Sequence, residues 1–404
     1  DISDFKTAYE IGIESTKLFD ITLPKSYNKL YFIFDFLVLK LRLKSKNDVA
    51  FLYELENAKD EDIITAVRIL SAILKVAYQI RPELSVAISV KIVNICLKYG
   101  LTKESVIGFM VFGVNFQGGI LGNHTLGYDY SRFCRDMLNR FEDDTLKSEV
   151  EFVCGYFSNS WINPSSDTEK QWIDSYKIGL ETGDWFHTGC SAAGITQSMF
   201  MRGVPFDKVY EKIKQFEVIL KSINAKEQLE TIVSIKQAMK CIQKQTVSNS
   251  SFTDNEFDEF SYMVKIRGFE SKHFAHYYFI NKMIALYFNE EYSEANEVIY
   301  ESKEYKESSL GMLHNTEHTF YEAMIKAMSY EESSFFEKHK IIKQLDEAKS
   351  LFHKWSKNCP ENFYVRALLL EAEIYRLKKN YNQAISTYKE ALIHASNYKQ
   401  VHLK

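Results

Sequence analysis

The segment of this sequence best suited to chemistry is His314-Asn315-Thr316-Glu317-His318, which matches the H-x-x-E-H pattern of one class of zinc peptidase. On a helix, two histidines four positions apart lie on one face, so both imidazoles can bind one metal ion while the glutamate acts as a base. A third protein ligand is also needed, and spacing selects none of the nearby carboxylates Glu322, Glu331 and Glu332. The pattern fixes only three positions, and the interpretation that we favour is a partly exposed first turn of a repeat helix whose Phe320, Ala323 and Met324 face the core. We therefore keep a zinc metallopeptidase that uses His314, Glu317 and His318 as the alternative from the enzyme class.

The other short motifs point away from catalysis. His273 and His276 lie three positions apart, and helix packing explains them; the glycine-rich run Gly118–Gly122 has no lysine after it and no strand pattern before it. The sequence contains neither a G-x-x-x-x-G-K-[ST] phosphate-binding loop nor a G-x-S-x-G nucleophile elbow. Its six cysteines are scattered without a C-x-x-C pair, which is typical of reduced core residues. We predict a non-enzymatic chain without catalytic, cofactor-binding or metal-binding residues and without a cofactor.

Charge and hydropathy limit the classes of partner. The formal net charge is −4, so no global electrostatic footprint for nucleic acid or an anionic membrane is visible. The one dense basic run, Lys40–Lys46, could contact an acidic partner or lipid headgroups, but we interpret it as a solvated helix end beside the acidic stretch Glu54–Asp62. The apolar segment Leu30–Leu39 is too short to span a membrane, and Val106–Gly122 carries polar residues and glycines that suit a buried helix. We predict a cytoplasmic protein with a protein or peptide partner, no nucleic acid and no membrane insertion.

The elements that would position these residues are helical hairpins. Ala372 and Tyr375 share one face of a first helix, a short polar turn follows, and Ala384, Tyr388 and Ala391 mark one face of a second helix. This is the spacing of a tetratricopeptide (TPR) hairpin, in which small residues allow two helices to approach closely. Degraded copies of the pattern occur at residues 3–16 and 290–303. Five prolines and sixteen glycines in 404 residues also favour long helices. The predicted fold class is all-α, an α-α superhelix (solenoid) of divergent TPR-like hairpins.

Periodicity and capping signals predict the limits of the helices. Thr182-Gly183-Asp184 indicates a C-cap glycine followed by an N-cap aspartate. The Ser-, Thr- and Asn-rich stretch Gln245–Asp254 predicts a loop or soft hinge between two segments of one superhelix, residues 1–245 and 246–404. Neither end shows a polar capping helix, so we expect a piece of a longer protein. Helices are predicted near 4–19, 27–43, 47–56, 60–79, 83–99, 102–119, 124–140, 145–160, 168–182, 184–201, 206–222, 225–243, 254–265, 271–288, 292–305, 311–328, 335–357, 361–378 and 382–396.

Several stretches, in their order along the chain, resemble one family. They are AYEIGIESTKLFDITLP, GLETGDWFHTGCSAA, MFMRGVPFDKVYEKIKQF, EHTFYEA and the C-terminal hairpin from Lys354 to Ala395. The most specific pieces are the corner Gly179–Asp184 and the junction Cys359–Asn362. Together they resemble the TPR-like helical repeat region of large bacterial signalling proteins. In those proteins a serine/threonine-kinase-like domain and an AAA-type ATPase precede the region, and a GAF domain with a histidine kinase or a cyclase usually follows.

The resemblance implies a regulatory module whose partners are neighbouring ATPase or kinase domains of the same polypeptide, or another protein or peptide. No kinase, P-loop or phospho-acceptor motif of that family is matched in this sequence. We therefore predict a non-catalytic interaction module that relays or restrains signalling between domains. The alternative within the binding class is a free-standing TPR-type adaptor for a protein partner.

Overall fold

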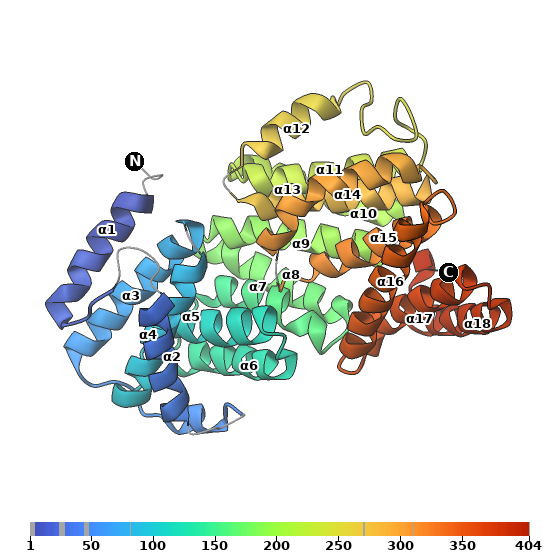
Figure 1. Ribbon diagram of the computed structural model, residues 1–404. Helices are drawn as coiled ribbons and strands as arrows, with labels where there is room; N and C mark the ends of the chain where they lie inside the picture. Colours follow the sequence, from blue (N-terminus) through green and yellow to red (C-terminus); the bar gives the residue numbers. More distant parts are fainter. Residues whose placement is uncertain are drawn as a thin grey trace. The chain divides into compact units, whose positions relative to one another are not determined.

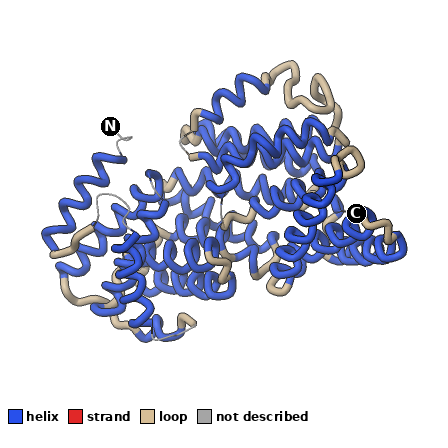
Figure 2. Tube along the Cα trace, in the orientation of Figure 1, coloured by secondary structure: helices blue, strands red, loops and turns tan. Residues whose placement is uncertain are grey.

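The computed structural model describes residues 5–23, 29–43, 48–80, 82–269, 271–309 and 311–403. In these ranges the chain consists of helices joined by loops, with one isolated backbone bridge and no strand (Figure 2). The predicted all-α fold class is confirmed, and superhelical stacking stays a prediction. The chain divides into two compact units, Asp1–Ser158 (unit 1) and Asn159–Lys404 (unit 2). The segment boundary predicted at residue 245 falls inside unit 2.

The helices of unit 1 (Figure 1) are α1 (Phe5–Thr16), α2 (Lys29–Leu43), α3 (Glu61–Ile80), α4 (Pro82–Tyr99), α5 (Ser105–Phe109), a π-helix (Met110–Ile120), α6 (His124–Arg140) and α7 (Lys147–Phe157), with 3₁₀ turns at Lys17–Phe19 and Ala50–Glu54. The first residues of the predicted helices 4–19 and 27–43 lie outside the described residues, as does the end of the basic run, Lys44–Lys46. Within that run, Arg42 donates a hydrogen bond to the backbone carbonyl oxygen of Asn94 at 2.6 Å.

The segment predicted as a helix at 102–119 is α-helical only at its start and continues as the π-helix. At its end the backbone N–H of Leu121 donates to the carbonyl oxygen of Phe116, five residues earlier, at 2.9 Å. The π-helix lies directly against α6: a β-carbon on Gly118 would lie 2.9 Å from the Cα atom of Gly127, and the reverse distance is 2.6 Å. A buried helix whose glycines permit close approach is therefore confirmed, and the ordinary α-helical geometry is corrected.

The α-helix predicted at 47–56 is wrong for its described residues, 48–56. Only Ala50–Glu54 turns, as a short 3₁₀ helix. Beyond it, Leu101 donates its backbone N–H to the carbonyl oxygen of Glu56, and Ala58 donates to that of Leu101, both at 2.8 Å. These bonds hold residues 56–58 extended beside the end of α4.

The helices of unit 2 are α8 (Ser165–Thr182), α9 (Trp185–Met201), α10 (Phe206–Ser222), α11 (Lys226–Ile242), α12 (Glu259–Arg267), α13 (Lys272–Phe288), α14 (Tyr292–Lys306), α15 (His314–Met328), α16 (Phe335–Ser356), α17 (Pro360–Leu377) and α18 (Tyr381–Asn397), with 3₁₀ turns at Asn159–Trp161, Glu307–Ser309 and Val401–Leu403. The predicted corner between α8 and α9 is confirmed. Gly183 takes the left-handed conformation with φ 79°, and the Asp184 side chain accepts from the backbone N–H of His187 at 3.2 Å.

The predicted break at Gln245–Asp254 is a loop that is fixed to the helices on both sides. Phe252 is fully buried, and the ammonium of Lys282 on α13 lies 4.3 Å from the centre of its ring. Asp254 accepts from the ammonium of Lys240 on α11 at 2.6 Å. The loop runs on to Asp258, whose side chain caps α12, so that helix begins at Glu259 rather than at the predicted 254.

The hairpin α17–α18 has the predicted packing of small residues. Ala372, Ala384 and Ala391 are exposed by 3% or less, which allows the two helices to lie close together (Figure 1). Tyr388 on α18 donates from its hydroxyl to the carboxylate of Glu373 on α17, which fixes the pairing of the two helices. The same hairpin type therefore occurs where the sequence spacing predicts it.

In the described part of the chain, no helix is both long enough and apolar enough to cross a membrane.

Candidate functional site

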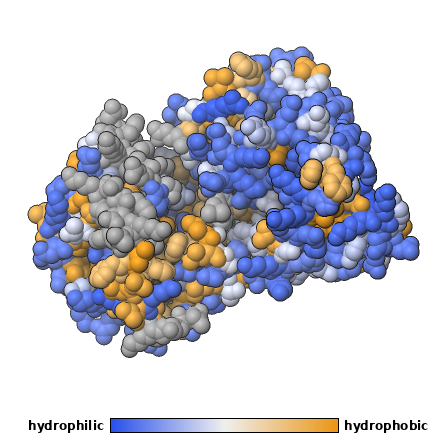
Figure 3. Space-filling view, viewed as in Figure 1, coloured by the Kyte–Doolittle hydropathy of each residue, from blue (hydrophilic) through white to orange (hydrophobic). Residues whose placement is uncertain are grey.

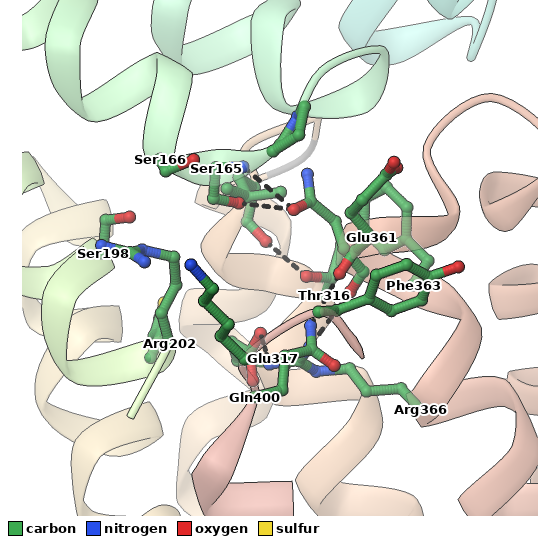
Figure 4. A pocket seen from close by; sticks show the side chains of 16 residues that line it. Ser165, Ser166, Ser198, Arg202, Thr316, Glu317, Glu361, Phe363, Arg366 and Gln400 are labelled. Atoms are coloured by element: carbon green, nitrogen blue, oxygen red, sulfur yellow. Dashed lines mark hydrogen bonds and ion pairs between the residues drawn. The ribbon is translucent and has the colours of Figure 1, made fainter. Parts of the chain in front are cut away.

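The H-x-x-E-H segment forms the first turns of α15. The prediction that this turn is partly exposed is wrong, because α13 and α17 cover its three side chains. His314, Glu317 and His318 are exposed to only 2%, 6% and 1%. Glu317 faces α17, where its carboxylate pairs with Arg366 at 2.7 Å (Figure 4), whereas His314 lies against the ring of Tyr277 on α13. Because the carboxylate is held by Arg366, it is not placed to act as the base beside a metal bound by the two imidazoles.

The imidazole of His318 belongs to a buried chain of hydrogen bonds between α13 and α15. Its Nδ1 lies 2.8 Å from Nε2 of His276, and Nδ1 of His276 lies 2.8 Å from the hydroxyl of Ser309. On the other side, Nε2 of His318 lies 3.4 Å from Glu322, which also pairs with Lys306 at 2.8 Å. An N–H on Nε2 of His318 best suits the carboxylate, so His276 donates to His318 and Ser309 donates to His276. The chain thus joins two helices through neutral imidazoles.

Burial keeps these histidines uncharged. The pKa of His273 is lowered to about 4 by burial, and burial also lowers the pKa of His318. Burial, together with the neighbouring imidazoles, places the pKa values of His276 and His314 well below the ordinary value. Glu322 has a pKa of about 2, because its bonds to His318 and Lys306 outweigh the opposing effect of burial. His276, His318 and Glu322 therefore form a buried hydrogen-bond network in the core of unit 2.

We expect unit 2 to lose stability on mild acidification. The unfolded chain binds protons at its histidines below pH about 6.5, whereas folded His273, His276 and His314 stay neutral, so each of these three costs about 1.4 kcal/mol for every further pH unit. Burial raises the pKa of Glu317, which acts in the opposite direction, but this concerns one carboxyl group against three histidines. All four tryptophans lie in unit 2, so urea unfolding followed by tryptophan fluorescence at pH 8 and pH 5.5 measures this effect. An unfolding midpoint that stays constant or rises toward pH 5.5 would contradict it.

The other sequence candidates for metal binding are dispersed. Glu322 is engaged by Lys306, and Glu331 and Glu332 are exposed beyond the end of α15. Within the described ranges, no three His, Cys, Asp or Glu side chains are placed to hold one metal ion. Gly118–Gly122 packs against α6 or ends the π-helix, and the six cysteines are unpaired and buried, as the sequence analysis expected.

The surface of unit 2 offers a different kind of site, a groove of about 540 Å³ formed by α12, α13 and α14. Phe260 and Val264 on α12 are exposed to 78% and 61% and lie four positions apart, on one face of the helix. Apolar atoms are visible over α12 near the top of Figure 3, with strongly hydrophilic atoms beside them. The apolar lining of the groove consists of Phe260, Met263, Val264, Phe279, Leu286 and Val298.

The border of this groove is acidic. Of its seven charged side chains, Lys282 pairs with Glu259 at 2.5 Å and Arg267 pairs with Glu301 at 2.8 Å. The remaining three charged side chains are all carboxylates, Asp258, Glu294 and Glu297. Among the described residues none of them has an ion-pair partner. We call the groove with this border the acidic groove.

The acidic groove is not evident from the sequence alone. Its signal is present on α14, where Glu294, Glu297 and Glu301 recur at helical spacing beside Val298. The same stretch also carries the spacing of the TPR pattern, which indicates a helix but no binding surface. The spacing on α14 does not show that α12, with its exposed Phe260, lines the same groove. That placement depends on the path of the chain between the two helices.

A scan of the chain against models of known protein families found no match, and a search of curated proteins found no similar protein.

Proposed function

We propose that the chain is a non-catalytic, protein-binding helical module, and that the acidic groove of unit 2 binds a basic amphipathic segment of its partner. The observation that carries the proposal is the exposed apolar surface of α12 beside three carboxylates without an ion pair. An exposed apolar surface with a charged border is typical of a site that binds an amphipathic helix. The all-helical fold and the α17–α18 hairpin agree with a module of this class.

The charges of the groove select the class of partner. Glu294 and Glu297 are available to lysine or arginine side chains, whereas an acidic segment would be repelled. The apolar residues of the partner would cover Phe260 and Val264, which are otherwise exposed to water. Surface ion pairs are screened by salt, so the charges chiefly set specificity and the apolar contact chiefly sets affinity.

A labelled synthetic peptide tests this proposal. We expect a helix-forming peptide of leucine and lysine to bind the chain more tightly at low than at high ionic strength, as measured by fluorescence anisotropy. The double variant Glu294→Gln/Glu297→Gln should weaken binding about tenfold, because two attractive contacts of about 0.5–1 kcal/mol are lost.

The matched control is Glu331→Gln/Glu332→Gln, which removes the same charge from exposed positions outside the groove. It should bind the peptide as the wild type does. Equal weakening in the two double variants would show that net charge, rather than the groove, attracts the peptide.

We further propose that the module acts in the cytoplasm and relays or restrains signalling between an ATPase or kinase domain and an output domain of a longer protein. The support is the family resemblance of the sequence. A free-standing adaptor is the alternative, and the reading frame around residues 1 and 404 distinguishes the two. Deletion of the module from the full-length protein should change its ATPase or output activity, and unchanged activity would refute the relay.

A further inference from the structure

One face of α2 in unit 1 is apolar and uncovered. Ile33, Phe34, Leu37 and Leu41 are exposed by between 41% and 76%. Steps of one, three and four positions place these side chains on one side of the helix. Apolar atoms gather over α2 in the lower left part of Figure 3. A contiguous exposed apolar surface of this kind is typical of a docking surface.

The opposite face of α2 holds the helix on unit 1. Leu39 is fully buried, and the buried carboxylate of Asp35 pairs with the ammonium of Lys91 on α4 at 3.5 Å. Nδ2 of Asn94, also on α4, donates to the backbone carbonyl oxygen of Asp35 at 3.0 Å. Because these contacts fix α2 to α4, the helix presents its apolar face outward without any unfolding of unit 1.

The charges beside this apolar face are basic. Among the side chains of α2 that the structure describes, the exposed charged ones are Lys40 and Arg42, and neither pairs with a described carboxylate. Lys40 lies seven positions after Ile33 and therefore on the apolar face itself. The helix α2 thus combines exposed apolar side chains with positive charge, which is the combination that the acidic groove of unit 2 favours.

We propose that α2 of one copy of this chain docks into the acidic groove of a second copy, an assignment that rests on the proposed function of the groove and names one partner for it. The apolar side chains of α2 would cover Phe260 and Val264, so both exposed apolar surfaces would leave water together. Lys40 and Arg42 would meet the carboxylates of the groove border. An anionic lipid surface would also accept such a helix, but the net charge of −4 opposes that occupant.

This contact joins two different surfaces, so it does not end at a dimer. Each copy in a pair keeps one free α2 and one free groove, and association therefore continues until a ring closes or a filament forms. The contact is small, so association should be weak and should depend on concentration. In analytical ultracentrifugation over about 1–100 μM, the mean mass of the wild type should rise beyond that of a dimer, and high salt should reduce it.

Two variants with complementary defects test the contact. Leu37→Gln/Leu41→Gln removes the apolar face of α2 and keeps the groove, whereas Glu294→Lys/Glu297→Lys reverses the groove and keeps α2. Each variant alone should stay monomeric. An equimolar mixture should form heterodimers and nothing larger, because only one intact α2 and one intact groove are present in each pair.

Ile11→Gln/Leu18→Gln is the matched control, because it replaces two exposed apolar side chains of unit 1 outside α2. It should associate as the wild type does, and far-UV circular dichroism verifies that all variants are folded. Association of the groove variant alone would mean that two α2 faces meet each other, which would overturn the proposal.

A wild type that stays monomeric would also overturn it. Binding of the leucine–lysine peptide would then leave the proposed function of the groove intact, whereas failure of the peptide as well would remove both. If a monomeric wild type binds vesicles of phosphatidylcholine and phosphatidylserine and the α2 variant does not, a lipid surface rather than a second copy covers α2.

Discussion

Substitution of Arg366 by methionine should destabilise unit 2 by about 3–5 kcal/mol, the usual result of removing one partner of a buried ion pair. Arg366 is exposed to 4%; its guanidinium pairs with Glu317, donates to the backbone carbonyl oxygen of Asn362 at 3.0 Å and lies over the ring of Phe320. In the variant the carboxylate of Glu317 stays buried without its cation. Urea unfolding followed by tryptophan fluorescence measures the effect in unit 2 alone, since unit 1 has no tryptophan.

The second substitution Glu317→Leu provides the control for this prediction. In the double variant Arg366→Met/Glu317→Leu no charge is left buried, so most of the lost stability should return. If the double variant is less stable than Arg366→Met alone, the loss comes from packing around Phe320 rather than from the unpaired carboxylate. If Arg366→Met has the wild-type unfolding midpoint, the ion pair does not exist as described.

Substitution of Gly127 by alanine should destabilise unit 1 by about 3 kcal/mol or more, the upper range of overpacking effects. The new β-carbon would lie 2.6 Å from the Cα atom of Gly118, and the obstacle is backbone, which cannot turn aside as a flexible side chain does. Far-UV circular dichroism follows both units, whereas tryptophan fluorescence follows unit 2. We therefore expect an earlier transition by circular dichroism and an unchanged one by fluorescence.

Gly122→Asn is the matched control in the same region. Gly122 has φ 72°, a conformation that asparagine tolerates, and a β-carbon there meets nothing within 4 Å. This variant should lose about 1 kcal/mol or less. Similar losses in the two variants would contradict the close contact between the π-helix and α6.

Local signals in the sequence predicted most helices of this fold. The limits predicted for 124–140 and 206–222 coincide with those of α6 and α10. The corner between α8 and α9 shows why such limits can be predicted from the sequence. There Gly183 ends one helix and Asp184 caps the next, and both effects involve only neighbouring residues. The errors occur where distant residues decide. Backbone pairing of Glu56 and Ala58 with Leu101 fixes an extended segment directly after the short turn Ala50–Glu54, and contact with α6 accompanies the π-helical geometry.

The functional residues were harder to predict for the same reason. The H-x-x-E-H spacing correctly placed its residues on one helix, but their roles depend on Arg366 from α17 and His276 from α13. The acidic groove likewise needs α12 beside α13 and α14. None of these pairings is encoded in local spacing.

A charge-swap experiment tests most directly whether the acidic groove is the docking site. Fluorescence anisotropy would compare the basic leucine–lysine peptide with a leucine–glutamate peptide on the wild type and on Glu294→Lys/Glu297→Lys. We predict that the wild type prefers the basic peptide and that the variant prefers the acidic one. If both proteins prefer the same peptide, the groove does not select the partner and the proposed function is wrong.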